Sequence, residues 1–259
     1  MAPASPDLVV LLGIALVAFG GGIGIATVGP GGVFVTVALV AATAYGPGTI
    51  AGTMSAALFL GGLLGTAAYL RSGELRAREG RRIALVISVA SGAGAFAGSQ
   101  LNALFSPASF EPAVAGFVLL TGVLLWVRDR GVFEPIAAID PTSTRGGVVL
   151  AGIGAGVGLP SGLFGVGGPV LAVPLLVLVG IPMLTAVGAA QLLSVFVAGS
   201  ATSGYLLRGT VDPALLAAVA APMLAGIGVG WRVAHRVESD RLRSLLALVL
   251  VGSGGVLLL

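Results

Sequence analysis

The sequence has no cysteine, no lysine and a single histidine, and only 9% of its 259 residues are charged. Without cysteine, the chain cannot form disulfides, use a thiol nucleophile or bind metal through thiolates. A soluble domain carries about 25% charged residues, whereas this chain is 57% hydrophobic and cannot cover a water-facing surface. Its apolar runs are continuous and do not alternate as membrane-barrel strands do. We therefore expect an all-α integral membrane protein.

Residues that could carry enzymatic chemistry are also missing. No Asp, Glu, His or Lys lies within an apolar segment, and the one Arg, Arg232, stands near the end of its segment, so the usual intramembrane proton or cation carrier is absent. We find no Ser/His/Asp set, metal cluster or phosphate-binding loop. We therefore predict a protein that is not an enzyme and uses no cofactor or metal. The net charge of +3 comes from arginines beside apolar segments, so we expect a lipid bilayer and no nucleic acid as partner, with the oligomeric state left open.

A dense glycine run, GLFGVGGPVLAVP, occupies residues 162–174, and a weaker copy, GPGG, occupies residues 29–32. Glycine and proline both weaken helices, so each motif predicts a break in a membrane helix. Backbone at such a break must be buried in protein or line a wet cavity, because hydrocarbon offers it no partner. Paired breaks in matching positions of two halves are typical of transporter binding sites.

Apolar segments between charges and Gly/Pro breaks divide the chain into two halves. We assign residues 1–127 to a first membrane repeat, 128–146 to a cytoplasmic linker and 147–259 to a second membrane repeat. Each short segment that follows a glycine motif either crosses the membrane or re-enters it, and the sequence leaves both open. The ten expected segments are Leu8–Val28, Val33–Tyr45, Thr49–Leu70, Ile83–Leu104, Ala113–Val127, Gly147–Phe164, Pro169–Ile181, Leu184–Leu207, Pro213–Ala234 and Ser244–Leu259.

The two halves match each other at a fixed offset, which predicts an internal duplication. An offset of 136 places the first glycine motif on the second and also pairs Tyr69 with Tyr205. After the arginine-rich loop the offset becomes 132 and aligns the GxxxG pairs at 94–98 and 226–230. Arginines concentrate at 71–82 in the first half and at 232–243 in the second, so positive-inside orientation makes the halves inverted copies. Both chain termini are then expected outside the cell.

The glycine breaks are the first candidates for a binding site. Pro169 suits the first position of a helix, where the free N–H groups of the first turn attract anions. Hydroxyls and an amide near the breaks add further donors. The alternatives are close helix packing for the glycines, which we favour for the GxxxG pairs, and interhelical hydrogen bonds for the polar side chains. The candidate substrate-binding residues are Gly29, Gly31, Gly32, Ser55, Ser161, Gly165, Gly167, Gly168, Gln191 and Ser194.

The stretch SGLFGVGGPVLAVPLL, with its weaker repeat VGPGGVFVTVAL, resembles the glycine-rich signature of the TauE/SafE sulfite exporter family. The first copy departs from the second at Ala38, where the second has Pro174. The resemblance covers the whole chain. It implies a multi-pass permease of the prokaryotic plasma membrane for small anions such as sulfite, sulfonates or other organosulfur compounds.

These observations predict a transporter of small anions that works by alternating access around the two glycine breaks. One alternative is an anion channel that uses the same helix ends without rocking. A second alternative is a membrane scaffold or accessory subunit that transports nothing. Saturable flux with counter-transport distinguishes the transporter from the channel, and stabilisation by an anion distinguishes both from the scaffold.

Overall fold

A computed structural model describes residues 8–27, 31–72, 78–129 and 139–234, and within these ranges every regular element is helical. The N-terminal residues, Gly29 and the predicted segment Ser244–Leu259 lie outside the described residues. The described α-helices are α1 (Leu8–Thr27), α2 (Gly31–Ala42), α3 (Pro47–Ser72), α4 (Arg78–Leu101), α5 (Pro107–Asp129), α6 (Thr144–Phe164), α7 (Pro169–Leu178), α8 (Met183–Leu207) and α9 (Pro213–Ala234), and a 3-10 turn spans Asn102–Leu104.

Six of these helices, α1, α3, α4, α6, α8 and α9, are long and apolar enough to cross a membrane. Helices α2 and α7 have only 12 and 10 residues. At about 1.5 Å per residue they measure roughly 18 and 15 Å, against a hydrocarbon core of about 30 Å. Because every regular element in the described residues is a helix, the predicted all-α class is confirmed for them.

Several helices begin or end at different residues from those expected. Helix α4 begins five residues before the predicted Ile83, and α5 begins at Pro107, where Ala113 was expected. Hydropathy marks where the apolar stretch starts, whereas a helix can start earlier in the chain, at a residue that caps its first turn. Ser106 and Ser109 form such a cap, because the backbone N–H of each donates to the hydroxyl of the other at 3.0 and 3.3 Å.

The turn before α6 is fixed by polar side chains. Ser143 caps the helix by accepting the N–H of Gly146 at 2.9 Å. Asp140 accepts both the hydroxyl and the backbone N–H of Thr142, and these hydrogen bonds hold the pKa of the exposed carboxyl below its usual range. Arg82, from the start of α4, donates to the Thr142 carbonyl at 2.6 Å. The starts of α4 and α6 therefore lie at the same end of the molecule.

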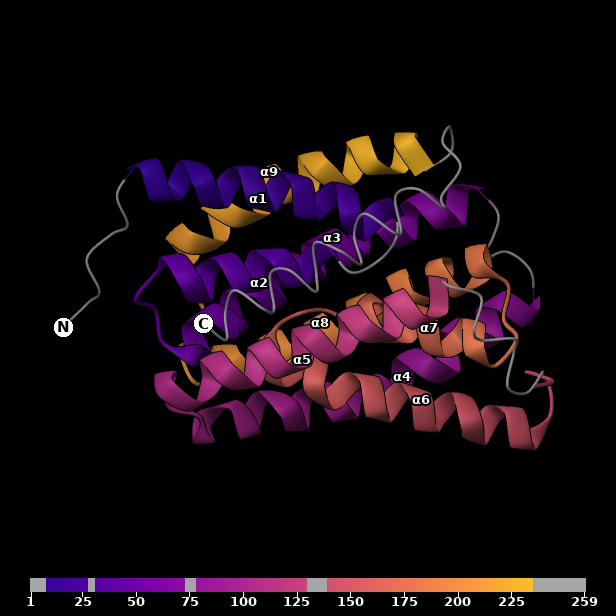
Figure 1. Cartoon of the computed structure of the whole chain (residues 1–259). Helices are drawn as coiled ribbons and strands as arrows, with labels where there is room; N and C mark the ends of the chain where they lie inside the picture. The colour runs from indigo at the N-terminus through magenta and orange to yellow at the C-terminus, as the bar shows by residue number, and fades with distance from the viewer. Residues whose placement is uncertain (1–7, 28–30, 73–77, 130–138, 235–259) are drawn as a thin grey trace.

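Helix pairs from different halves of the chain form the frame of the fold. Helix α1 packs against α9, α4 packs along α6, and α3 packs against α8 between these two pairs (Figure 1). The first two contacts are made by glycines: a Cβ on Gly98 would overlap the carbonyl oxygen of Leu159, and one on Gly226 would overlap that of Phe19. The packing role predicted for these two GxxxG pairs is confirmed.

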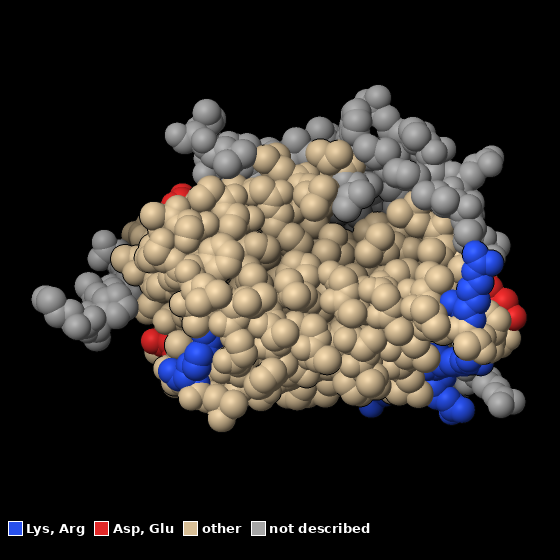
Figure 2. All heavy atoms as spheres, turned by 90° about the horizontal axis from the view of Figure 1, so that it is seen from below, with Lys and Arg blue, Asp and Glu red and all other residues tan. Residues whose placement is uncertain are grey.

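The charged side chains of the described residues gather at the two ends of the molecule. Figure 2 shows blue and red side chains at both ends of one long face and a wide uncharged band between them. Large apolar side chains lie exposed on the helices, as in Leu16 at 73% and Val148 at 67%. Water would penalise this surface, whereas lipid accommodates it, so these faces fit the hydrocarbon of a bilayer.

Candidate functional site

The second glycine motif joins the end of α6 to the start of α7 through residues 165–168. Gly165 and Gly167 adopt φ values of 66° and 86°, in the left-handed region that favours glycine. Gly165 also lies directly on α3, since a Cβ there would be 2.6 Å from the carbonyl oxygen of Ala51. Conformation and close contact both require glycine at this position.

Side chains from other helices satisfy the backbone of this motif. The last carbonyls of a helix have no partner within it, and here the Tyr205 hydroxyl donates to the Gly162 carbonyl at 2.8 Å. The Asn102 amide donates to the Leu163 carbonyl at 2.9 Å. Thr36 of α2 donates its hydroxyl to the Gly165 carbonyl at 3.1 Å. The motif therefore has the buried, hydrogen-bonded backbone that a membrane interior requires.

The described part of the first motif contacts both α1 and the second motif. A Cβ on Gly31 would overlap the carbonyl of Gly21 in α1. A Cβ on Gly32 would lie 3.0 Å from the carbonyl oxygen of Val166, in the second motif. The two motifs, 136 positions apart in the sequence, thus meet in space.

Helix α7 begins at Pro169, as predicted, and has no side-chain cap at Gly168. The first-turn N–H groups of a helix lack partners within it and carry a partial positive charge. At this end of α7 they adjoin the contact between the two motifs. The end of the helix therefore presents the kind of donor that anions bind.

A small cavity of about 10 Å³ lies where the two motifs meet. This volume is about that needed for one water molecule. Four predicted site residues line it together: Gly32, Gly167, Gln191 and Ser194. The other residues that line it are Ile25, Leu58, Gly61, Gly62, Val166 and Pro169.

The remaining described candidates lie close by but outside the lining of this cavity. The Ser161 hydroxyl donates to the Gly167 carbonyl at 3.2 Å, and the Ser55 hydroxyl donates to the Ala51 carbonyl in its own helix at 2.7 Å. Gly168 packs against the side chain of Leu193. These contacts shape the motifs and their supporting helices.

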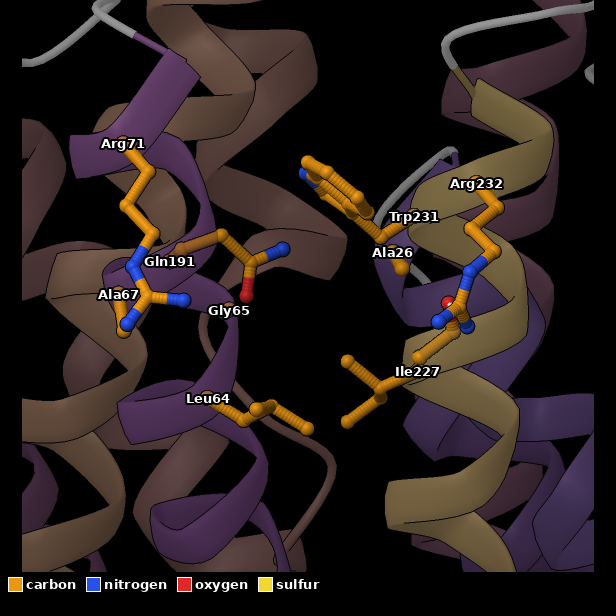
Figure 3. Close-up of a pocket in the computed structure, with 10 residues that line it drawn as sticks. Ala26, Leu64, Gly65, Ala67, Arg71, Gln191, Ile227, Trp231 and Arg232 are labelled. Atoms are coloured by element: carbon orange, nitrogen blue, oxygen red, sulfur yellow. Dashed lines mark hydrogen bonds between the residues drawn. The ribbon is translucent and has the colours of Figure 1, made fainter.

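A larger cavity of about 370 Å³ lies between α3 and α9. Gln191 lines both this cavity and the small one, so the two adjoin at that side chain. Figure 3 shows the Gln191 amide between the two helices, with Arg71 on one side and Arg232 on the other. Two guanidinium groups beside a cavity raise the local concentration of anions.

Sequence reasoning missed several residues that build these features. Thr36 and Asn102 bind carbonyls far away in the sequence, and nothing local in the sequence marks them for that role. For Tyr205 the sequence did contain a signal, because this residue matches Tyr69 in the internal repeat. Arg71 and Arg232 were interpreted only as residues that orient the chain, and their place beside a cavity depends on how α3 and α9 diverge.

Comparison with known proteins shows the family of this chain. The family model "Sulfite exporter TauE/SafE" matches residues 14–257. The chain is also similar to the probable membrane transporter protein YdhB of Bacillus subtilis (strain 168), with 28% identity over 248 residues that cover 95% of this chain and 99% of that protein. No solved structure matches the chain. With its apolar helices it is a multi-pass membrane protein, and it belongs to the sulfite exporter TauE/SafE family.

Proposed function

We propose that this protein is a permease that exports small anions, namely sulfite, sulfonates or related organosulfur compounds, across a prokaryotic plasma membrane. The observation that carries the proposal is the meeting of the two glycine motifs at one buried cavity beside the first turn of α7. Fixed backbone N–H groups in a low-dielectric site favour an anion without adding a buried charge to the protein. The family name gives independent support for sulfite.

Substrate binding is assigned first to the residues that line the small cavity. Gly32 and Gly167 let backbone approach the ligand, and Ser194 and Gln191 supply side-chain groups. Ser55, Ser161 and Gly168 support the same region from the neighbouring backbone and side chains. The remaining members of the proposed set are Gly29, Gly31 and Gly165.

The proposed architecture has two inverted repeats, residues 1–127 and 147–259, joined by a cytoplasmic linker at 128–146. The helix pairing supports it, because the first helix of each half packs on the fourth helix of the other, α1 on α9 and α6 on α4. Under this topology both termini lie outside. Helices α2 and α7 are then re-entrant halves that meet near the midplane, as their lengths suggest.

Transport is proposed to proceed by alternating access, and an asymmetry between equivalent helix pairs supports this. Helices α3 and α9 diverge around the larger cavity, whereas their repeat equivalents, α8 and α4, pack closely. Arg208 donates to the Ser99 carbonyl, and a Cβ on Gly204 would overlap the Ser99 hydroxyl. By the repeat offset of 132, Ser99 corresponds to Trp231, which lines the larger cavity. If α3 and α9 closed while α4 and α8 separated, the cavity would open on the opposite side of the membrane.

The proposal is tested by flux measurements on purified protein in proteoliposomes, with sulfite, sulfate, thiosulfate, taurine, lactate and chloride as probes. We expect saturable, counter-transported flux of an oxyanion, and thermal stabilisation by that anion of roughly 2.7 kcal/mol at a hundred times its dissociation constant. Gly32→Ala should reduce the flux, because its Cβ would crowd Leu58 and the Val166 carbonyl. Gly116→Ala is the matched control, since no atom of another described element lies within 4 Å of its Cβ position.

Two results would contradict the proposal in different ways. Flux without saturation or counter-transport would indicate a channel. No flux and no anion-dependent stabilisation would indicate a scaffold or accessory subunit.

A further inference from the structure

Gln191 is buried in α8 with 1% of its surface exposed, and its amide is fixed by one hydrogen bond. The Nε2 group donates to the carbonyl of Ile25 at 3.1 Å. Ile25 lies in the last turn of α1, where carbonyls lack a partner within the helix. Because a carbonyl can only accept, the amide must present its NH₂ group to Ile25, which fixes the position of its oxygen.

The Oε1 atom of Gln191 is left buried without a hydrogen-bond partner in the described structure. It lies against Gly65 of α3, where an added Cβ would be 2.5 Å away. A buried acceptor without a partner carries a desolvation cost, and such groups are uncommon in native proteins. Glycine at position 65 makes the space for this oxygen, so this arrangement depends on both residues.

The residue that carries this oxygen lies beside the proposed substrate path. Gln191 lines both the larger cavity beside Arg71 and Arg232 and the small cavity between the glycine motifs. An anion drawn into this region by guanidinium groups and helix N–H groups meets an acceptor that repels bare oxyanion oxygens. A ligand that also carries an O–H or N–H group satisfies that acceptor.

We infer that Gln191 Oε1 selects anions that carry their own hydrogen-bond donor, such as a hydrogen oxyanion or a hydroxy- or amino-substituted sulfonate. This inference rests on the proposed function and narrows its substrate class. Gln191 acts as a specificity residue: its NH₂ group holds α1, and its oxygen receives the donor of the ligand.

The test compares sulfonates that carry different groups on the carbon farthest from sulfur. Ethanesulfonate has no donor there and isethionate has an O–H at the same net charge, so these two differ only in the donor, as do propionate and lactate. Taurine carries an ammonium group there, which donates N–H and also cancels the net charge. Dissociation constants are measured with the purified full-length protein by titration calorimetry and thermal shift. We expect isethionate or taurine to bind about tenfold more tightly than ethanesulfonate, the gain of one net hydrogen bond. The two donor-bearing sulfonates distinguish an O–H ligand from an N–H ligand.

Two variants connect the preference to Gln191. Gln191→Met keeps the length of the side chain but removes the acceptor, and Gly65→Ala keeps Gln191 but forces its oxygen to move. Both should bring the ratio of dissociation constants close to one. Gly20→Ala, where no other helix of the described residues comes within 4 Å of the Cβ position, should leave the ratio unchanged. A cooperative unfolding transition without ligand shows that a variant is folded, even where its midpoint is lower, and the ratio is read only in folded variants.

The outcomes separate this inference from the proposed function. If the wild-type protein binds donor-bearing and donor-free anions equally, or if the preference persists in both folded variants, the inference is wrong and anion transport stands. If no anion of either series or of the flux panel binds, both proposals fail. A preference lost in both variants supports the inference.

Discussion

A Cβ atom added to Gly32 would lie 3.0 Å from the carbonyl oxygen of Val166, so the backbones of the two glycine motifs lie against each other. Leu58 of α3 covers this contact. Its side chain would be 2.9 Å from a Cβ on Gly32 and 3.3 Å from one on Gly167. Leu58 therefore limits the cavity between the motifs on the side of α3.

Leu58→Ala should enlarge this cavity and admit larger anions. Truncation of a buried leucine costs about 2–5 kcal/mol of stability, and Leu58 is only 5% exposed. Unfolding in lipid-detergent micelles measures the loss, and flux of sulfite against larger sulfonates measures the selectivity. Leu60→Ala is the control, because Leu60 lies on the same helix with 39% exposure. Equal selectivity in both variants would show that Leu58 does not limit the site.

Gly158→Ala should destabilise the protein by about 1–3 kcal/mol through overpacking. A Cβ at this position would overlap the backbone of Ser91, so α6 and α4 would have to move apart. Gly156→Ala lies two residues away, where no neighbouring helix in the described part of the chain comes within 4 Å of the Cβ position, and should instead gain up to about 1 kcal/mol of helix propensity. Thermal unfolding of the two variants side by side measures the difference. A similar shift in both would contradict the close packing of these helices.

Much of this packing could be predicted from the sequence, because glycine spacing and hydropathy are local signals. Helix α9 begins at the predicted Pro213, and α7 begins at the predicted Pro169. The partners of the Leu163 and Gly165 carbonyls could not be predicted, since Asn102 and Thr36 reach them from elements far away in the sequence. The larger cavity could not be predicted from the sequence either, because it depends on the separation of two helices.

Tyr205→Phe should cost about 1–3 kcal/mol by leaving the Gly162 carbonyl buried without its donor. The Leu163 carbonyl keeps the amide of Asn102, so the motif should loosen without unfolding the helix. Hydrogen exchange at residues 162–168 and thermal unfolding measure the effect. Tyr45→Phe, at a half-buried tyrosine outside the helices, should leave exchange at these residues unchanged. No change in Tyr205→Phe would mean that this hydroxyl does not support the motif.

Arg71→Gln and Arg232→Gln should each raise the KM for anion transport by about two- to fivefold at low ionic strength, the effect of one partly solvated charge. Both residues line the larger cavity, where their charge attracts the substrate. The effect should shrink as salt is added, because exposed charges are screened. Arg81→Gln removes an exposed arginine at the start of α4 and should leave KM unchanged. An equal effect in all three variants would indicate a general influence of net charge.

The close contact between α4 and α8 allows a direct test of alternating access, because the chain has no native cysteine to interfere. A Cβ on Gly204 would lie 3.2 Å from that of Ser99, near the roughly 3.5–4.5 Å that a disulfide requires. Oxidation of a Ser99→Cys/Gly204→Cys variant should stop transport, and reduction should restore it. The repeat offsets map this pair onto position 68 of α3 and position 231 of α9, and Trp231 lines the larger cavity. Cysteines there should cross-link only during transport, as α3 and α9 close. Full transport by the oxidised first pair would show that α4 and α8 need not separate and would contradict alternating access.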